Sequence, residues 1–379
     1  MATIFRSDGT EIEAQDKLVS GQNIKTVNGK SLLGSGNLVI EGGEGGGGVS
    51  VDEQQAIMGS PHIFLSSAVT SANLDAWVCT DIYDLYDALV SAHPDFFVRN
   101  TDLGSDQSGD YTLRHYTMRM QSPYVSRSYK PYDSSTNNYN RATMSPRTIL
   151  INSGIHGDEK SSVYGTYLAI KAILESSEEW AVFIRTNFCL EICPIANPWG
   201  FNNNVRPNSA DVNLNRDFFS ETPQAETTCL KNLIASCYNL HAVLDSHNTT
   251  YTTTPHSGSV PYAYLCSMVA FNFHPYYCRV ATMLASANFS RLDTLFKNAS
   301  LGNQKPYICV WLSSNRGTFM DYVNTGLNLL GGTVESISGQ GANPLNDAKW
   351  SEVTQYMLIN LIEIYGCKEY DKSNSVVSA

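Results

Sequence analysis

Basic residues are scarce in this chain of 379 residues. Lysine and arginine together number 25, against 36 aspartates and glutamates, which leaves a formal net charge of −11. Nucleic-acid-binding domains present a basic face to the phosphate backbone. We therefore expect no nucleic-acid partner.

Long apolar runs are also missing. No stretch approaches the roughly 20 apolar residues that a membrane-spanning helix needs, so we expect no membrane span. The opening residues, MATIFRSDG, lack the apolar core of a signal peptide. We expect no signal peptide and synthesis in the cytoplasm.

Paired cysteine motifs are absent as well. The 9 cysteines form no Cys-x-x-Cys pair. Cys189 and Cys193 stand at an even spacing in an apolar run, which places both on one face of a strand. We favour buried free thiols over a disulfide framework.

A glycine-rich stretch divides the sequence near its front. The run EGGEGGGG, which begins at Glu41, cannot pack a core and is typical of a flexible linker. Before it, Asn28 and Gly29 stand between short β-prone runs, which predicts a hairpin. We expect a β-rich module over 1–42, a linker over 43–50, a connecting segment over 51–74, a large domain over 75–370 and a flexible tail over 371–379.

The first of these segments carries a recognisable motif. The run NIKTVNGKSLLGSGN, from Asn23 to Asn37, resembles a module common in tail-fibre and other structural proteins of bacteriophages and prophages. So short a piece cannot hold a core alone. The resemblance implies a phage-tail or virion setting, with virion assembly or homo-oligomerisation through residues 1–42.

Strand-like and helix-like runs alternate over the rest of the chain. With 42% hydrophobic and 11% aromatic residues, this part suits a packed globule. The alternation predicts an α/β fold with a single mixed β-sheet and helices on both faces. The expected strands are Thr148–Ile155, Phe188–Ile195, Ala242–Asp245 and Gly332–Ile337. The expected helices are Ile82–Ala92, Ser161–Glu175, Gln224–Ser236, Val280–Ala287 and Ser351–Ile364.

An imidazole and a carboxylate leave the end of the first of these strands. His156 and Glu159 stand three positions apart in ILINSGIHGDE, and His247 follows a second apolar run in AVLDSHN. These are zinc ligands by type, and open α/β sheets place their sites outside the carboxyl ends of strands. We predict one zinc ion held by these three residues. His241 is the competitor for third ligand, and we reject it because it would enter the strand rather than leave it.

Further motifs follow in order. NPWGF begins at Asn197 and is followed by Arg206, NLNR begins at Asn213, and TVES places Glu335 at the end of another strand-like run. Together with the His-x-x-Glu and the later histidine, this order resembles the zinc metallocarboxypeptidase family, the carboxypeptidase A-like enzymes. The resemblance runs from about residue 80 to about residue 366 and so covers most of the chain.

The resemblance implies a role for each matched residue. Glu335 would be the general base that takes a proton from the attacking water. Arg206 would stabilise the tetrahedral oxyanion. Asn215 and Arg216 would bind the terminal carboxylate of a peptide substrate, which a guanidinium fork can hold by both oxygens. An enzyme with this set hydrolyses the C-terminal peptide bond.

Three positions depart from the family pattern. Asn213 replaces an aspartate that orients a ligating histidine, so we expect weaker zinc binding or a less acidic zinc-bound water, but not loss of activity. Trp199 replaces another aspartate, with no clear consequence. The usual substrate-capping tyrosine falls on Ser313, and the sequence does not choose between Trp311 and Tyr251 as its substitute.

Substrate specificity is expected around Thr318, Phe319 and Met320. By the resemblance, Met320 takes the position that often sets specificity, whereas Asp321 belongs to the framework. No acid at the specificity position pairs with lysine or arginine, so we expect a preference for neutral or apolar C-terminal residues. In a phage setting, stem peptides of bacterial peptidoglycan become candidate substrates, including D-amino-acid ends and γ-linked bonds.

Two other functions stay open. The chain would also fit an amidohydrolase of small acyl amino acids, or a virion structural or binding protein with a relic peptidase domain. Retention of Asn215 and Arg216 favours peptide ends, and the intact ligands with Glu335 argue against a relic.

Overall fold

The computed structural model describes residues 4–5, 11–12, 72–121, 147–251, 260–267, 306–312, 317–340 and 344–367. The chain divides into two compact units, Met1–Gln54 and Gln55–Ala379. In the first, β1 (Ile4–Phe5) pairs antiparallel with β2 (Glu11–Ile12). The expected hairpin at Asn28, the linker and the expected helix at 280–287 lie outside the described residues.

One mixed sheet of eight strands organises the described part of the second unit, in the order β11-β10-β12-β9-β7-β8-β6-β3. Strands β7, β8, β9 and β12 form parallel pairs, β10 pairs parallel with β11, and the pairs β10–β12, β6–β8 and β3–β6 are antiparallel. The bounds are β3 (Phe97–Arg99), β6 (Tyr116–Met118), β7 (Arg147–Ser153), β8 (Phe188–Cys193), β9 (Leu240–Tyr251), β10 (Val260–Ser267), β11 (Pro306–Leu312) and β12 (Leu330–Gln340). A small separate ladder joins β4 (Gly104–Ser105) to β5 (Thr112–Leu113).

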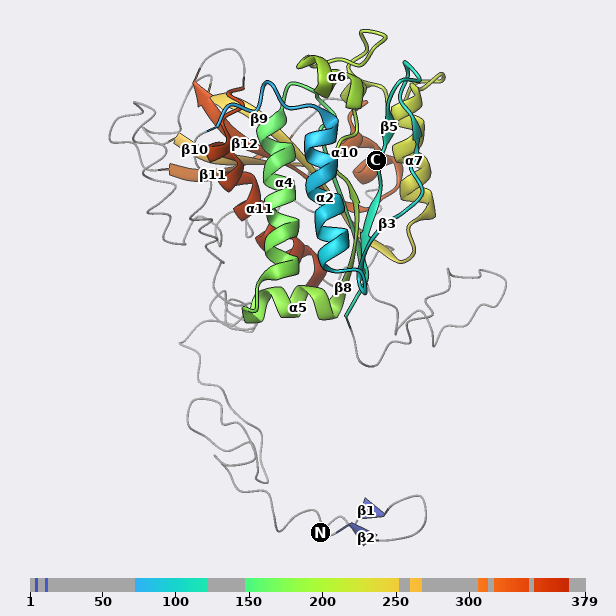
Figure 1. The fold of residues 1–379 in the computed structure, drawn as a ribbon, viewed down its shortest axis with the longest axis vertical. Coiled ribbons are helices and arrows are strands. Elements are labelled where there is room, and N and C mark those ends of the chain that lie inside the picture. Colours follow the sequence, from blue (N-terminus) through green and yellow to red (C-terminus); the bar gives the residue numbers. More distant parts are fainter. Residues whose placement is uncertain are drawn as a thin grey trace. The chain divides into compact units, whose positions relative to one another are not determined.

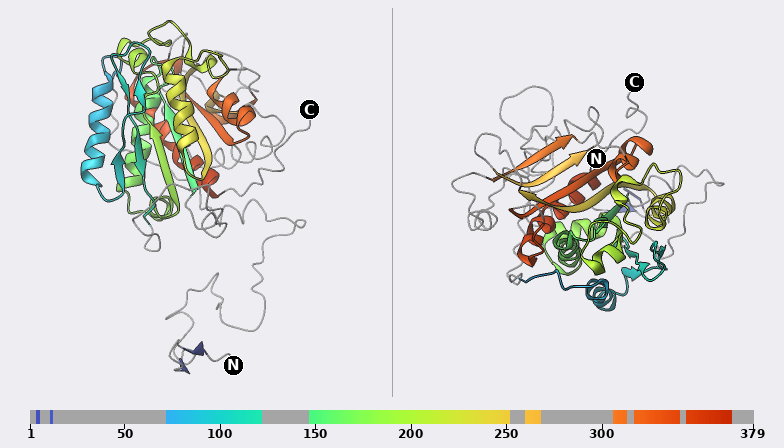
Figure 2. Two further views of the ribbon diagram at one scale, coloured as in Figure 1. Left: turned by 90° about the vertical axis from the view of Figure 1, so that its right-hand side faces the viewer. Right: turned by 90° about the horizontal axis from the view of Figure 1, so that it is seen from above.

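Helices cover both faces of this sheet (Figures 1 and 2). One layer consists of α2, α4 and α11, which pack on one another and on the central strands, and α7 and α10 lie on the other side. The bounds are α2 (Cys79–Ala92), α4 (Lys160–Glu175), α5 (Glu179–Asn187), α6 (Pro198–Asn203), α7 (Ala225–Ser236), α10 (Phe319–Asp321) and α11 (Ser351–Cys367), with the short turns η2 (Leu214–Arg216), η4 (Tyr322–Gly326) and η5 (Ala348–Trp350). The predicted mixed α/β sheet with helices on both faces is confirmed.

The central strands are apolar on both faces because both faces are covered. In β7, Ile149 and Ile151 pack into the core under α2, α4 and α11, whereas Leu150 packs into the core on the α7 side. A parallel strand buried on both faces reads as a continuous apolar run rather than an alternation. That run brings the chain to the sheet edge where the candidate ligands begin.

Two strands extend further than the sequence indicated. We expected strands over 242–245 and 332–337, with the ligand His247 after the first, but β9 continues to Tyr251 and β12 to Gln340. His247 and Glu335 therefore lie inside strands, and the prediction that His247 follows a strand end was wrong. We expected this strand to end at Asp245, yet Asp245, His247 and Asn248 find hydrogen-bond partners within the sheet, and pairing continues through them.

The five cysteines in the described residues, Cys79, Cys189, Cys193, Cys229 and Cys237, are free thiols, as expected. Among the described helices, none combines the length and the apolarity needed to cross a membrane.

Candidate metal centre

The first two candidate ligands lie on a tight turn between β7 and α4. Gly154 has φ +65°, a conformation that glycine adopts without strain. Gly157 lies against the backbone of a second loop, since a Cβ there would stand 2.0 Å from the carbonyl carbon of Gly200. Glu159 then takes the N-cap position of α4, with φ −97° and ψ 51°. The turn thus aims both ligand side chains toward β9.

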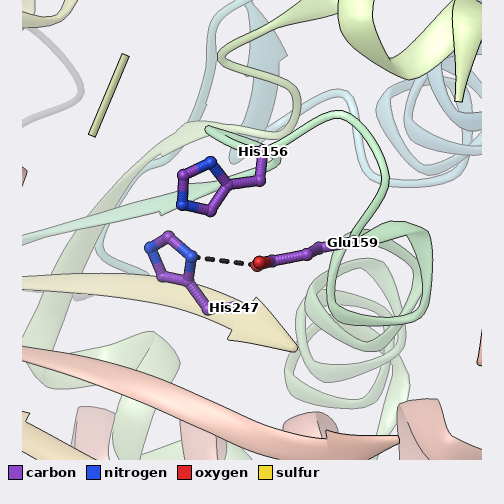
Figure 3. A group of neighbouring side chains, drawn as sticks. All are labelled: His156, Glu159 and His247. Atoms are coloured by element: carbon purple, nitrogen blue, oxygen red, sulfur yellow. Dashed lines mark hydrogen bonds and ion pairs between the residues drawn. The ribbon is translucent and has the colours of Figure 1, made fainter. Parts of the chain in front are cut away.

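The three predicted ligands meet. One ligand atom each from His156, Glu159 and His247 lies within 4.8 Å of the others. The three residues are buried, at 1%, 3% and 1% exposure. His247 Nδ1 lies 2.9 Å from Glu159 Oε2, and the two imidazole centroids are 5.0 Å apart (Figure 3). The structure therefore brings together residues that are 88 positions apart in the sequence.

A carboxylate orients His247 from within its own strand. Asp245, two positions earlier on the same face of β9, has Oδ2 2.8 Å from His247 Nε2. Asn152 of β7 donates to Asp245 Oδ1 at 2.7 Å. This chain of contacts places the Nε2 proton of His247 toward Asp245, so Nδ1, which faces Glu159 Oε2, is the nitrogen that would bind a metal ion. The sequence reading missed Asp245, although the Asp-x-His spacing on a strand was a usable signal.

Asn248 holds the Glu159 carboxylate through its backbone, and the sequence analysis did not identify it either. Its backbone N–H donates to Glu159 Oε2 at 2.9 Å. Its side-chain oxygen accepts from the Ser161 hydroxyl at 2.8 Å, in the first turn of α4. Asn248 thus ties β9 to the start of α4, next to the carboxylate. No sequence pattern marks such a residue, because the contact joins segments 87 positions apart.

His156 has a different environment. Its Nδ1 is buried and, among the described residues, no partner faces it. Arg206 Nη2 lies 2.7 Å from His156 Nε2, and Arg206 Nη1 donates to Glu159 Oε1 at 2.8 Å. Burial lowers the pKa of His156 well below its usual value, and the neighbouring Arg206 charge lowers it further.

These donors fit a zinc ion. Two imidazoles and one carboxylate are the protein ligands found at catalytic zinc sites. A buried imidazole nitrogen without a partner is costly, and His156 Nδ1 would gain a partner in a metal ion. Histidine and arginine charges already hold the pKa of Glu159 well below its usual range despite its burial, so the carboxyl is ionised and ready to bind a cation.

Glu335 lies beside His247 on the neighbouring strand. In the parallel register of β12 and β9, Glu335 is the Cα partner of His247, so their side chains lie on the same face of the sheet. Loss of hydration raises the pKa of Glu335 to about 7, although the nearby His247 opposes the shift. The side chain is partly exposed, unlike the three ligands.

The Asn213–Arg216 segment packs against the Gly317–Asp321 segment. Asn213 Oδ1 accepts from the backbone N–H of Asn215 at 3.0 Å. Asn215 Oδ1 accepts from the backbone N–H of Phe319 at 2.9 Å, which leaves its amide N–H groups to offer a ligand. Arg216 is exposed, and it is close enough to Arg206 and Glu335 for their charges to act on its pKa.

All three of the expected specificity positions are buried, with Thr318 at 8%, Phe319 at 0% and Met320 at 2% exposure. Met320 is 2% exposed and packs in the core on the α7 side, with its sulfur against Gly331. Asp321 is a framework residue in its contacts, since Oδ2 accepts from Gly317 N–H at 3.0 Å and Oδ1 accepts from the Thr325 hydroxyl at 2.7 Å.

The remaining predicted positions split between described and undescribed parts of the chain. Trp199 lies in α6, and His241 lies near the start of β9, away from the ligand end of that strand. Ser313, and the side chains of Trp311 and Tyr251, lie outside the described residues.

Comparison with solved structures supports the fold assignment. The carboxypeptidase A from Helicoverpa armigera aligns over 84% of this chain and 81% of its own, with a TM-score of 0.54 and 13% identity. Thrombin activatable fibrinolysis inhibitor aligns over 83% and 79%, with a TM-score of 0.53 and 13% identity. No family model matches the sequence, and no curated protein matches it. The chain therefore has the carboxypeptidase fold, shown by three-dimensional similarity at low identity.

Proposed function

We propose that this chain is a zinc-dependent carboxypeptidase, which hydrolyses the C-terminal bond of peptides or peptide-like amides. The observation that carries the proposal is the convergence of His156, Glu159 and His247, whose ligand atoms lie within 4.8 Å of one another. These side chains would hold one zinc ion. When bound, the ion supplies Lewis acidity and lowers the pKa of a water molecule toward about 7.

Proton transfer is assigned to Glu335. A carboxyl whose pKa lies near the working pH can both accept a proton from water and return it to the leaving amine. Loss of hydration, together with the charges of Glu159 and Asp245, raises the pKa of Glu335 to about 7 in the metal-free chain. Its register with His247 supports this assignment, because it puts the carboxylate beside a metal ligand.

Arg206 is the group we assign to the developing oxyanion. Its guanidinium lies against Glu159 Oε1 and His156 Nε2. If His156 binds an ion through Nδ1, its Nε2 carries the proton and can no longer accept from Arg206. The guanidinium would then have N–H groups free for a substrate oxygen. Removal of one such donor typically costs about 10²–10³ in rate.

The free carboxylate of the substrate is assigned to Asn215 and Arg216. Both are at least partly accessible, and the contact of Asn215 Oδ1 with Phe319 N–H fixes which end of the amide faces outward. An amide N–H group beside a guanidinium is a suitable pair for a carboxylate. Recognition of that group restricts hydrolysis to chain ends.

The proposal is tested by metal analysis combined with a peptide-end release assay, with and without chelator. We expect about one equivalent of zinc, and release of free amino acids that stops on chelation and returns with zinc. Release of an acyl group from small conjugates, without release from peptides, would favour the amidohydrolase. Bound zinc without hydrolysis of any peptide would favour a virion protein with a relic domain.

We further propose a preference for neutral or apolar C-terminal residues. Met320 stands where an acid would be needed to pair with lysine or arginine. Competition between peptides that end in Leu, Lys and Glu tests this point. A clear preference for Lys would show that an acid elsewhere in the chain lines the pocket.

The biological setting we propose is a phage tail or virion, with residues 1–42 as an assembly module. The proposal rests on the NIKTVNGKSLLGSGN motif. In that setting the peptides would be peptidoglycan stem peptides. Hydrolysis of isolated stem peptides, compared with unmodified linear peptides of the same length, tests it.

A further inference from the structure

The ligand turn is held from outside by one asparagine. Asn346 Oδ1 accepts from the backbone N–H of Lys160 at 3.0 Å, and Asn346 Nδ2 donates to the carbonyl of Asp158 at 3.0 Å. Asp158 and Lys160 are the two neighbours of Glu159. One side-chain amide therefore binds the peptide groups on both sides of a candidate metal ligand. Asn346 is 6% exposed and follows Glu159 by 187 positions, so no local pattern marks it.

Residues 74–77 support this arrangement around Asn346, which we call the Asn346 clamp. The Asn346 carbonyl accepts from Leu74 N–H at 2.6 Å, and Asn346 Nδ2 also donates to Asp75 Oδ1 at 2.8 Å. Lys160 Nζ donates to the carbonyls of Asp75 and Trp77, each at 2.8 Å. Its ammonium also lies 4.8 Å from the ring centroid of Phe201. The clamp thus joins four segments that lie far apart in the sequence.

We propose that Asn346 is a positioning residue for the metal centre, which fixes the backbone of Glu159 and thereby the direction of its carboxylate. This inference rests on the proposed zinc site. Glu159 is the N-cap of α4 and its backbone angles are not helical, so the helix alone does not set its conformation. With both flanking peptides bound to one rigid amide, rotation about the Glu159 backbone would break a hydrogen bond. Without the amide, Glu159 would have to be ordered when the metal binds.

Asn324 provides a matched control within the same chain. It is likewise a buried asparagine, at 2% exposure, and its amide donates to the carbonyls of Leu329 and Gly331 at 3.0 and 3.3 Å. Through these two bonds it ties η4 to the start of β12. Loss of either asparagine should destabilise the fold, but only the loss of Asn346 should release Glu159.

The experiment measures zinc affinity in the full-length chain. Metal-free wild type, Asn346→Ala and Asn324→Ala are titrated with zinc alone against a chromophoric chelator, and their thermal stability is measured in parallel. Groups that orient metal ligands typically contribute about 10–100-fold to affinity. We expect a loss of that size in Asn346→Ala and a change below about threefold in Asn324→Ala. Hydrogen exchange at Lys160 N–H should accelerate in Asn346→Ala only.

A nearly isosteric variant guards against failure to fold. Asn346→Asp keeps an acceptor for Lys160 N–H, but it loses the donors to Asp158 and Asp75 and sets its carboxylate against that of Asp75, so a loss of affinity is again expected. If wild type binds no zinc, the proposed function fails at that step. If wild type binds zinc and the Asn346 variants bind it equally well, or if Asn324→Ala loses as much affinity, the positioning role is refuted and the proposed function stands.

Discussion

The two histidines of the candidate centre differ in how the fold holds them. His247 lies inside β9, where Asp245 two positions away and Asn152 on the next strand set its ring through hydrogen bonds. His156 lies on a turn, its Nδ1 has no partner among the described residues, and its Nε2 faces Arg206. A strand supplies orientation through its own register, whereas a turn depends on neighbours from elsewhere in the chain.

The same difference appears in their protonation. Burial alone would lower the pKa of His247, but Asp245 and Glu159 raise it well above its usual value. Burial lowers the pKa of His156, and Glu159 only partly offsets that effect. One imidazole is therefore held in its charged form by carboxylates, and the other is held neutral.

The largest expected effects distinguish the metal ligand His247 from Glu335, its partner on the neighbouring strand. His247→Ala should lose most of the bound zinc, because the remaining two ligands do not make a catalytic site. Glu335→Gln, at the paired position on β12, should keep the zinc and lose about 10²–10⁴-fold in hydrolysis, since an amide cannot accept the proton. Metal analysis and turnover decide both. An unchanged zinc content in His247→Ala would show that His247 is not a ligand. Substantial turnover in Glu335→Gln would show that another residue is the general base.

Smaller changes in zinc affinity test which residue orients the ligating histidine. Asp245→Asn should weaken zinc binding by about 10–100-fold, because the neutral amide orients and polarises His247 less well. Asn213→Asp should change zinc binding little, because Asn213 Oδ1 bonds to the backbone of Asn215. Competition with a chelator measures both affinities. A large gain in Asn213→Asp would mean that the orienting role belongs there, as the family pattern implies.

The pH dependence of stability should differ in sign between the two histidines in metal-free protein. The pKa of His247 is raised in the folded state. Its contribution to the free energy of unfolding is therefore complete below the unfolded pKa of about 6.5 and is lost as pH rises through the folded pKa. The folded pKa of His156 is lowered, so the unfolded chain takes up a proton first and stability falls as pH drops below about 6.5. Each slope approaches about 1.4 kcal/mol per pH unit in its window.

Urea unfolding at several pH values, in the presence of chelator, checks this prediction. Relative to wild type, His247→Gln should cost more stability at pH 5.5 than at pH 9. His156→Gln should be least harmful, or stabilising, at acidic pH. Parallel curves for the two variants would show that the surroundings of the histidines do not differ as described.

The smallest effect concerns the region before the second unit. The described contacts that hold the ligands and the Asn346 clamp join residues of the second unit to one another. A chain that begins at Val51 should therefore be soluble, bind zinc and hydrolyse peptides like the full chain, while it loses any oligomer that the full chain forms. Light scattering and the release assay measure both. An insoluble or inactive product would place part of the enzyme before Val51.

Part of the site was predictable from local sequence alone. His156 and Glu159 follow an apolar run whose length and β-branched content mark a buried strand. The helix from Lys160 to Glu175 differs from the prediction by a single residue. Local sequence specifies such elements because their burial pattern and their boundaries lie in one segment.

The supports of the site were not predictable in the same way. Asn248 and Asn346 act on Glu159 from positions 89 and 187 residues later in the sequence. The strand around His247 was predicted to end at Asp245, because the polar side chains that follow have partners only in the folded chain. Tertiary contacts satisfy Asp245 and Asn248 and so keep β9 paired where propensity predicts its end. Such residues are recognised only once the neighbouring segments are placed.

Gly157 restricts which sequences could occupy this site. Its α-carbon is so close to Gly200 that an added methyl group would stand 2.0 Å from one backbone atom and 2.3 Å from the next, Phe201 N. No rotamer change relieves a clash with backbone, so even alanine would push the two loops apart. Residue 157 is therefore a position without tolerated alternatives, and in a saturation library it should be depleted as strongly as the ligands, although it has no side chain to contribute.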